Sequence, residues 1–318
     1  MKLKLSLILL SATLLLLMLN SCKPKALSPR EGYIEVTGGK IWYRINGEGN
    51  KTPILLLHGG PGSSSYYLDP LKELSKDRPV IFIDQLGSGR STRITDTTLM
   101  NIEQYVEQVE QVRKELDLKD FYLYGHSWGT MLGIDYYLKY PSEVKALLFH
   151  SPLFSTDLWI KDADTLITTL PDSIQVIIRE NEKHKTYTSD EYLSAVKLYY
   201  SKFLKRKESS QTHQDSSNML NGVNVYEFMW GPSEFTATGN LLNYDRVKDL
   251  SKIVVPTLLL AGEYDEARPS TVRYFQSLIP GSEFTVIKNS GHVTMHDNLP
   301  ETIIAINQFL LKVDKLTR

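Results

Sequence analysis

The chain has 318 residues, of which 42% are hydrophobic, and a formal net charge of −1 at pH 7. This is an ordinary globular composition, with enough apolar side chains for one large α/β domain or for a domain with an insertion. It contains no basic stripe and no long run of like charges, so the sequence does not favour a nucleic-acid partner.

The first 21 residues have the pattern of an export signal. Two lysines precede an apolar run from Leu5 to Leu19, which is shorter than the roughly 20 residues that a membrane-spanning helix needs. Leu19-Asn-Ser-Cys22 resembles the lipobox of bacterial lipoproteins. We therefore predict that residues 1–21 are a lipoprotein signal peptide and that Cys22, the one cysteine in the sequence, is the lipidation site. The alternative is a plain secretory signal in which Cys22 is incidental.

Several acyl chains on one cysteine would anchor a protein stably, whereas a single chain would be marginal. The prediction is therefore an exported protein that is lipid-anchored to a bacterial membrane, on its periplasmic or cell-surface side.

The first strands are predicted after a polar linker over residues 22–32. The alternating runs Tyr33–Thr37 and Lys40–Asn46 flank two glycines and predict an antiparallel hairpin. The continuous apolar runs Pro53–His58 and Pro79–Asp84 are typical of buried parallel strands.

A glycine-rich loop ends the first of these buried strands, in the segment His58-Gly-Gly-Pro-Gly62. Such a loop can bring free backbone N–H groups close to a ligand, and the alternative is a tight turn with no ligand. A nucleophilic serine is predicted further along the chain, at Ser127. In folds with such a serine the loop after the third strand supplies an oxyanion-hole donor, and we nominate Gly60 for that role. His58 is expected to form structural hydrogen bonds beneath the loop.

The segment Asp84-Gln-Leu-Gly-Ser-Gly-Arg-Ser91 contains a Gly-x-Gly pattern. The full G-x-G-x-x-G is absent and no helical pattern begins there, so dinucleotide binding has little support. From Asn101 to Leu116 the apolar residues recur at helical spacing, which predicts a helix.

The strongest functional signal is Gly125-His-Ser-Trp-Gly129, which lies between an apolar strand that begins at Phe121 and a helical pattern. A strand that reverses into a helix within about one residue strains the central residue, so its flanking positions must be glycine. This G-x-S-x-G spacing therefore predicts a nucleophile elbow. Ser127 would stand at the helix N-terminus, and the backbone N–H of Trp128 would face a substrate oxyanion.

The hydrophobic pattern changes from strand-like to helical after the predicted strand Val144–His150. From about 153 to 242 helical patterns dominate, including one behind a Thr188-x-x-Glu191 capping box, while the polar stretch Lys205–Ser217 predicts an exposed loop. Residues 153–242 are thus predicted to form a mainly helical cap.

After the cap, the sequence again shows the alternation of strands and helices that is typical of a parallel sheet, with two strands and two helices. The predicted elements are the strand Ile253–Ala261, the helix Ser270–Leu278, the strand Glu283–Lys288 and the helix Pro300–Val313. The fold class predicted is an α/β-hydrolase fold, with a mostly parallel central sheet, helices on both faces, and a cap inserted between residues 33–152 and residues 243–318.

Two further residues complete a candidate catalytic set. A serine hydroxyl needs a base, and the base needs an acid, which in this fold follow in the order serine, acid, histidine. Asp265 lies in Gly262-Glu-Tyr-Asp-Glu266 directly after a buried strand, and His292 follows the last strand in the same way. The predicted triad is therefore Ser127, Asp265 and His292.

His292 and His296 are four residues apart, as two metal ligands on a helix can be. No H-E-x-x-H glutamate lies between them, so we do not predict a metal site. The triad mechanism needs no organic cofactor, and none is predicted.

The motifs around these residues resemble those of the prolyl aminopeptidase (proline iminopeptidase) family of α/β hydrolases, including its tricorn-interacting-factor branch. The segments that carry the resemblance are His58–Gly62, Asp84–Ser91, Gly125–Gly129 and Gly262–Glu266. The resemblance covers the chain from about residue 33 to the last helix and is weakest across the cap.

The resemblance implies a serine aminopeptidase that releases N-terminal residues from short peptides. Members of the family hold the substrate's ammonium with glutamates, one in a Gly-Pro-x-Glu-Phe segment of the cap and one after the triad aspartate. Glu234 in Gly231-Pro-Ser-Glu-Phe235 and Glu266 match these positions. The alternative is that both are ordinary solvated carboxylates.

Three hypotheses therefore remain open at this point. The first is a lipid-anchored serine aminopeptidase, in which a preference for proline is undecided. The second is an esterase or lactonase on the same scaffold, because a triad alone does not choose between amide and ester. The third is a binding lipoprotein with an inactive hydrolase fold, which an intact triad disfavours.

Overall fold

The structure is a computed structural model that describes residues 27–208 and 210–316. The predicted signal peptide and Cys22 lie outside the described residues. Eight strands form one sheet in the order β1-β2-β4-β3-β5-β6-β7-β8. The pairs β1–β2 and β2–β4 are antiparallel, and every other neighbouring pair is parallel. The predicted α/β-hydrolase fold, with its mostly parallel central sheet, is confirmed.

Every predicted strand is present, but β1 begins at Arg30, inside the predicted linker, and β7 begins at Thr257, after the predicted start at Ile253. Their bounds are β1 Arg30–Val36, β2 Gly39–Asn46, β3 Ile54–Leu57, β4 Val80–Ile83, β5 Phe121–His126, β6 Val144–His150, β7 Thr257–Gly262 and β8 Glu283–Ile287. All residues of β3, β4, β5 and β7 are buried, as expected of parallel strands that helices cover on both faces.

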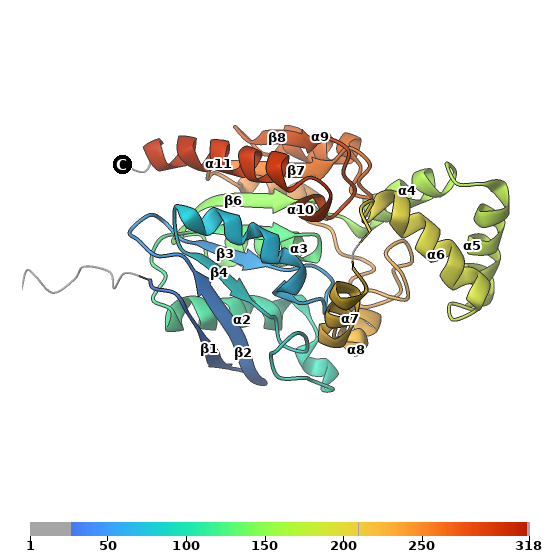
Figure 1. The fold of residues 1–318 in the computed structure, drawn as a ribbon, viewed down its shortest axis with the longest axis horizontal. Helices are drawn as coiled ribbons and strands as arrows, with labels where there is room; N and C mark the ends of the chain where they lie inside the picture. Colours follow the sequence, from blue (N-terminus) through green and yellow to red (C-terminus); the bar gives the residue numbers. More distant parts are fainter. Residues whose placement is uncertain (1–26, 209, 317–318) are drawn as a thin grey trace, which may run out of the picture.

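Helices cover the two faces of the sheet. One face packs against α2 (Ile102–Glu115), α3 (Trp128–Lys139) and α9 (Pro269–Leu278), and the other against the 3₁₀ helix η1 (Ser65–Lys76) and α11 (Leu299–Leu316). Successive strand residues alternate between these two apolar clusters: Leu55 belongs to the first and Leu56 to the second. The sheet is therefore the middle of three layers (Figure 1).

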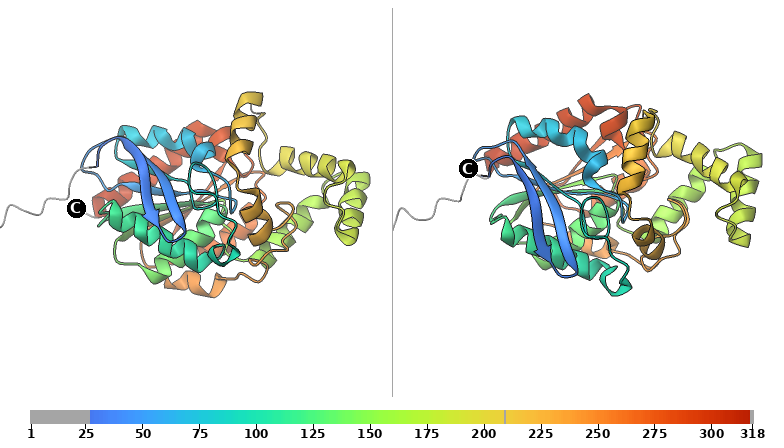
Figure 2. Two further views of the ribbon diagram at one scale, coloured as in Figure 1. Left: turned by 90° about the horizontal axis from the view of Figure 1, so that it is seen from below. Right: turned by 60° about the horizontal axis from the view of Figure 1, so that its bottom comes forward.

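The segment between β6 and β7 is mainly helical. It contains α4 Thr156–Ile167, α5 Asp172–His184, α6 Asp190–Phe203, α7 Gln211–Leu220, α8 Val223–Met229 and the 3₁₀ helix η3 Val247–Lys252. In Figures 1 and 2, α4, α5 and α6 project away from the sheet, whereas α7 and α8 lie close to it. A separate apolar cluster joins α4, α5 and α6, and includes Ile178 and Tyr199.

Two local predictions in this segment are wrong. Ser189, not Thr188, caps α6, since its hydroxyl accepts a hydrogen bond from Tyr192 N–H at 3.3 Å. Glu191 instead accepts a hydrogen bond from the Asn181 side chain. The predicted loop over 205–217 becomes helical at residue 211, where α7 begins behind Ser210.

The remaining described elements are short or follow the prediction closely. They are the 3₁₀ helix η2 Thr97–Leu99 and the short helix α10 Thr294–Asp297. Asn101 caps α2 by accepting a hydrogen bond from Gln104 N–H, which confirms the predicted start of that helix. Across residues 27–208 and 210–316, no helix combines the length and hydropathy needed to cross a membrane.

Candidate active site

The elbow has the strained geometry that its spacing predicts. Ser127 has φ 55° and ψ −124°, a backbone conformation that residues other than glycine rarely adopt. A Cβ on Gly125 would lie 2.3 Å from the Gly129 oxygen, and one on Gly129 would lie 2.2 Å from the Leu57 oxygen. Only glycine fits at either flank, and the turn therefore places Ser127 at the N-terminus of α3.

The glycine-rich loop is held beside the elbow by buried hydrogen bonds. His58 accepts from Gln85 N–H through Nε2 at 2.9 Å, and its Nδ1 lies 2.9 Å from the Gly59 oxygen. The Gln85 side chain bridges the His58 carbonyl oxygen and the Trp128 indole N–H. Burial lowers the pKa of His58, so the ring is neutral and donates through Nδ1. His58 thus forms the structural hydrogen bonds expected of it.

Two backbone N–H groups near Ser127, those of Gly60 and Trp128, are left without protein partners. The neighbouring Gly59 N–H, in contrast, donates to the Tyr67 hydroxyl at 2.7 Å. Gly60 N–H donates to no described group, and neither does Trp128 N–H in the first turn of α3. The two donors nominated for an oxyanion are therefore free to receive one.

The structure brings Asp265 and His292 into direct contact. Asp265 Oδ1 lies 2.8 Å from His292 Nδ1 and accepts from Ala267 N–H at 2.8 Å. Oδ2 accepts from Gly262 N–H at 3.0 Å and from the Ser151 hydroxyl at 2.6 Å. Four donors therefore fix this carboxylate, and it fixes the ring of His292.

The second nitrogen of His292 has no partner, and the ring lies close to the elbow. Nε2 is buried and forms no hydrogen bond, and the ring lies 4.7 Å from that of His126, the residue before Ser127. The cap supports this loop: His292 N–H donates to the Phe203 oxygen at the end of α6, at 2.8 Å. A Cβ on Gly291 would lie 2.6 Å from that same oxygen, which explains why a glycine precedes the histidine.

A chain of hydrogen bonds links the glycine-rich loop to the loop of His292. His126 Nε2 lies 3.0 Å from the His292 carbonyl oxygen, which can only accept, so Nε2 carries the proton. His126 Nδ1 then accepts from the Tyr67 hydroxyl at 2.8 Å, and that hydroxyl accepts from Gly59 N–H. Burial lowers the pKa of His126 well below its ordinary value, and the neighbouring rings of His292 and His150 lower it further. The ring is therefore neutral, and its Nδ1 can accept the hydrogen bond from Tyr67.

Glu266, next to Asp265, has the opposite environment. Its side chain is 1% exposed, and neither carboxyl oxygen has a hydrogen-bond partner. His292 Nδ1 lies 3.9 Å from Oε1. Burial raises the pKa of Glu266 well above its ordinary value, and the carboxylates of Glu234 and Asp265 raise it further.

Glu234 approaches the same place from the cap. Its backbone is held by Trp159, which donates to the Glu234 oxygen at 2.8 Å, and by the Tyr200 hydroxyl, which accepts from its N–H at 3.1 Å. Burial raises the pKa of the Glu234 carboxyl, against the opposing effects of His292 and the Tyr226 hydroxyl. Trp159 places Glu234 near the base, because its indole donates to the Glu234 carbonyl oxygen and its ring lies 5.5 Å from that of His292. Glu234 from the cap and Glu266 from the sheet edge therefore both approach His292.

His296 lies apart from this cluster. Its Nε2 donates to the Tyr67 carbonyl oxygen at 2.7 Å, and burial lowers its pKa to about 4. Within residues 27–208 and 210–316, no group of three or more histidine, cysteine or acidic side chains is placed to hold a metal ion.

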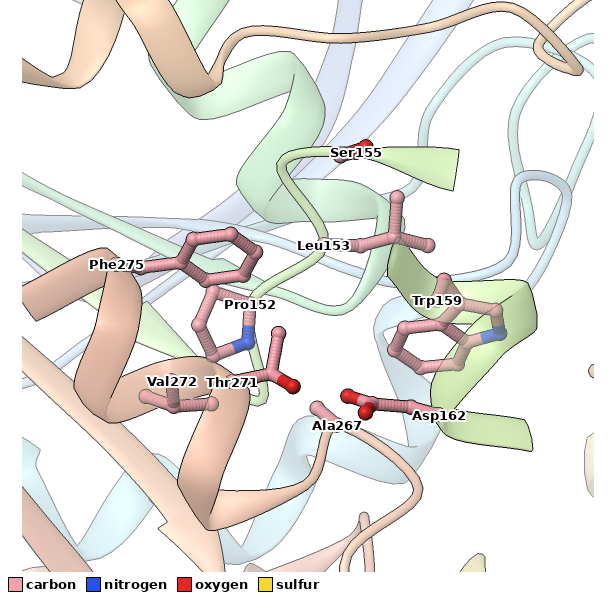
Figure 3. Close-up of a pocket in the computed structure, with 9 residues that line it drawn as sticks. All are labelled: Pro152, Leu153, Ser155, Trp159, Asp162, Ala267, Thr271, Val272 and Phe275. Carbon is pink, nitrogen blue, oxygen red and sulfur yellow. The ribbon is translucent and has the colours of Figure 1, made fainter. Parts of the chain in front are cut away.

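A small pocket lies behind Trp159, between α4 and α9 (Figure 3). Its polar lining includes Asp162, which pairs with Arg268 at 3.3 Å. The opposite side of the pocket is lined by apolar residues such as Phe275. None of the predicted site residues lines it. The ring of Trp159 also lies 5.5 Å from that of His292, so this residue separates the pocket from the site.

Three residues of this site are not identified by the sequence analysis. Ser151 directly follows β6, and its position at the carboxyl end of a parallel strand is a signal that could have found it. His126 lies inside the elbow motif, but nothing in the pattern indicates its partners. Tyr67 lies on η1, shortly after the glycine-rich loop, and no sequence signal indicates its role.

Comparisons with known proteins agree with the fold described above. The model of the α/β hydrolase fold family matches residues 52–299. A proline iminopeptidase of Heyndrickxia coagulans is 42% identical over 283 residues, which cover 88% of this chain and 98% of that protein. The solved proline iminopeptidase of Mycobacterium smegmatis superimposes with a TM-score of 0.83 at 28% identity, over 91% of this chain and 100% of that one. A solved esterase from Exiguobacterium antarcticum, with a TM-score of 0.65 at 22% identity over 88% and 99% of the two chains, shows the fold alone.

Proposed function

This chain belongs to the proline iminopeptidase family of α/β hydrolases, and from that premise we propose that Ser127, His292 and Asp265 are its catalytic triad. The chain is a hydrolase with aminopeptidase function, as its relatives indicate. The observation that carries the proposal is the pair of adjacent carboxylates beside His292, of which Asp265 binds the imidazole and Glu266 binds nothing.

The reaction begins when Ser127 Oγ attacks the carbonyl carbon of the first residue and His292 Nε2 takes the serine proton. Asp265 keeps the other proton of the ring on Nδ1, so that Nε2 is the basic nitrogen, and it stabilises the imidazolium that forms. Ser127 and His292 form no hydrogen bond in the free protein, and such contacts commonly tighten only with substrate bound.

The negative charge that develops on the carbonyl oxygen would be bound by Gly60 N–H and Trp128 N–H, both of which are free. His292 then returns its proton to the leaving amine, and the acyl-enzyme forms. Water, activated by the same imidazole, hydrolyses it and releases the N-terminal residue.

Recognition of a peptide's N-terminus needs negative charge at a fixed distance from the nucleophile, and Glu234 and Glu266 are proposed to supply it. They come from different parts of the chain, the cap and the sheet edge, and converge beside His292. A charge-assisted contact is strong where water is excluded, and Glu266 is buried. Short peptides with a free N-terminus are therefore the proposed substrates.

No observation favours the esterase or lactonase alternative, because the triad serves either reaction. The two are separated by comparing aminoacyl anilides with simple acyl esters. In Glu234→Ala and Glu266→Ala variants the ratio of kcat/KM for anilide to that for ester should fall steeply. An unchanged ratio would reject the amine-binding role and leave only a generic hydrolase.

A fluorophosphonate probe tests the nucleophile directly. Labelling should be found on Ser127 and should be lost in the Ser127→Ala variant. A panel of anilides of proline, leucine, alanine and phenylalanine would then measure the preference at the first position. The same panel bears on the proposed place in the tricorn-interacting-factor branch, which rests on the matched motifs.

The cellular location is also a proposal, which rests on residues 1–22 of the sequence. The protein is exported and anchored through lipid on Cys22, so that short peptides outside the cytoplasm would be its substrates. Metabolic labelling with a fatty-acid analogue should mark the wild-type chain and not a Cys22→Ala variant. Equal labelling of the two would exclude lipidation at this cysteine.

A further inference from the structure

Buried polar atoms without partners are concentrated around one point of the molecule. In the described part of the chain ten buried side-chain nitrogen or oxygen atoms have no hydrogen-bond partner, and five of them surround the two glutamates. They are both carboxyl oxygens of Glu266, the hydroxyls of Tyr199 and Tyr226, and His292 Nε2. Proteins rarely leave such atoms unpaired, so a gathering of them indicates a place for a ligand.

The groups that face Glu266 come from four segments. Asp265 lies beside it on the loop after β7, and His292 approaches from the loop after β8. Burial raises the pKa of Tyr199 and Tyr200 on α6 and of Tyr226 on α8, and the carboxylates of Glu234 and Glu266 raise it further, so these hydroxyls belong to the same cluster. Glu234, on the loop after α8, also raises the pKa of Glu266. Among the described residues no lysine or arginine forms an ion pair with either glutamate.

An ionised Glu266 in this place would be a buried charge with no donor and with two other carboxylates nearby. Transfer of such a charge from water costs several kcal/mol even after relaxation of the protein. The group avoids that cost by binding a proton or a cation. In the described part of the free enzyme no lysine or arginine pairs with Glu266, whereas the substrate brings a cation.

We propose that Glu266 holds a proton in the substrate-free enzyme and releases it when the substrate's ammonium enters, so that each N-terminus bound sets one proton free. The inference rests on the proposed amine-binding role and adds to it. The proton leaves the Glu266 carboxyl for solvent, and the ammonium, which keeps all of its own protons, donates to the resulting carboxylate. No covalent bond is made or broken.

The proton belongs on Glu266 and not on Glu234. Glu266 is 1% exposed, has no hydrogen-bond partner and has two other acids near it, whereas the Glu234 carboxyl has the Tyr226 hydroxyl and His292 near it, which both oppose the rise of its pKa. The pKa of Glu266 is raised well above its ordinary value by burial and by both neighbouring acids, which agrees with this assignment.

The proposal predicts how affinity depends on pH. Below the pKa of Glu266 in the free enzyme, peptide binding expels one proton, so the dissociation constant should rise about tenfold for each unit by which the pH falls. Above that pKa, and below the pKa of the peptide amine, the dependence should disappear.

Isothermal titration calorimetry of the full-length Ser127→Ala variant with the peptide Pro-Gly-Gly measures the released proton. Titrations at pH 6.5 are run in phosphate and in Tris, two buffers that differ in ionisation enthalpy. The difference between the two binding heats should equal the difference between the two ionisation enthalpies, which corresponds to about one proton released per peptide bound. Glu266→Gln in the same background should reduce the release to near zero. Glu227→Gln, an exposed glutamate on α8, is the matched control and should leave the release unchanged.

The outcomes separate this inference from the function on which it rests. N-acetylated Pro-Gly-Gly should not bind; equal binding of the acetylated and free peptides would overturn amine recognition itself. If only the free peptide binds tightly, and the binding heat is the same in both buffers, the release of a proton from Glu266 is rejected, whereas recognition of the amine is retained. Binding that weakens with potassium concentration but shows no buffer effect would assign a metal cation to the site in place of the proton.

Thermal stability gives a second readout that needs no ligand. A carboxyl whose pKa is raised in the folded state favours folding below its unfolded pKa and loses that contribution as the pH rises towards the folded value. Glutamine does not titrate. The melting temperature of Glu266→Gln minus that of wild type should therefore increase from pH 5 to pH 8, and a difference that stays constant would contradict the proposal.

Discussion

Asp265 and Glu266 are consecutive acids, each 1% exposed, and the protein treats them in opposite ways. Asp265 accepts hydrogen bonds from Gly262 N–H, Ala267 N–H and Ser151, and binds His292. Glu266 accepts none. One side chain turns towards the sheet edge, where donors from three segments converge, and the other turns towards the cap.

The difference separates a positioning role from a binding role. A carboxylate that the protein satisfies completely has little left to offer a ligand and can hold the base in one orientation. A carboxylate that the protein leaves unsatisfied has its interactions available for substrate. The predictions below each alter one side of this pair, in order of decreasing effect.

Asp265→Asn should have the largest effect. The amide would place a donor where His292 Nδ1 needs an acceptor, so the imidazole would present the wrong tautomer to Ser127. We expect kcat to fall about 10⁴-fold, to a similar degree for anilide and ester substrates. Steady-state kinetics on both substrates check this, and a loss confined to anilides would show that Asp265 acts on the amine and not on the base.

Glu266→Gln should show the reverse pattern. Loss of one charge from a buried ammonium contact costs about 2–5 kcal/mol, so kcat/KM for anilides should fall by between about 30-fold and about 5,000-fold, and the ratio of anilide to ester activity with it. Glu234→Gln should act in the same direction, and the exposed Glu227→Gln is the control. Equal losses on both substrate classes would remove the distinction between the two acids.

The satisfied side should also be the acid-sensitive one. Burial lowers the pKa of His150 to about 3, and that of His126 lies well below its ordinary value, so both stay neutral in the folded protein. Unfolded histidine gains a proton below a pKa of about 6.5, so stability is present above that pH and is lost as the pH falls towards 3.

At pH 5 each of these histidines should cost about 2 kcal/mol of the free energy of unfolding relative to pH 7. Urea unfolding should be measured in the Glu266→Gln background, because Glu266 contributes with the opposite sign over the same range. An unfolding free energy that does not change between pH 7 and pH 5 would exclude neutral rings in the folded state.

Tyr67→Phe should have the smallest of these effects. It removes the hydroxyl that joins Gly59 N–H to His126 and leaves two buried groups unpaired. We expect kcat to fall about tenfold for anilide and ester alike, because the change acts on the loop of Gly60 and not on the amine site. The exposed Tyr33→Phe is the control, and a change in the anilide-to-ester ratio would place Tyr67 on the cap side instead.

The elements that carry the chemistry are readable from the sequence because local rules determine them. The run Phe121–Tyr124 can only be a buried strand, and Gly125 and Gly129 are the only residues that the close approaches of the elbow allow. Asp265 and His292 follow strands, and parallel strands present their carboxyl ends at one edge of the sheet. Backbone periodicity and steric exclusion act within a few residues, so a single sequence expresses them.

Local rules are less reliable where neighbouring residues compete. Ser189 caps α6 although Thr188 has the better capping-box spacing, because Ser189 also donates to Asn181 on α5, and Glu191 is bound by the same asparagine. Residues 211–217 are polar enough for a loop, yet they form a helix that packs on η1, where His213 stacks on Tyr66. In both places tertiary contacts outweigh the local pattern.

Only the tertiary structure decides which of two consecutive acids is satisfied. The donors to Asp265 include Ser151, which is 114 residues away in sequence, and the acid that faces Glu266 comes from the cap. The series of hydrogen bonds that supports Gly59 runs through Tyr67 and His126 to His292. These three residues come from segments that are far apart in the sequence. A hydrogen bond forms over about 3 Å, and only the folded chain brings such distant donors and acceptors to that separation.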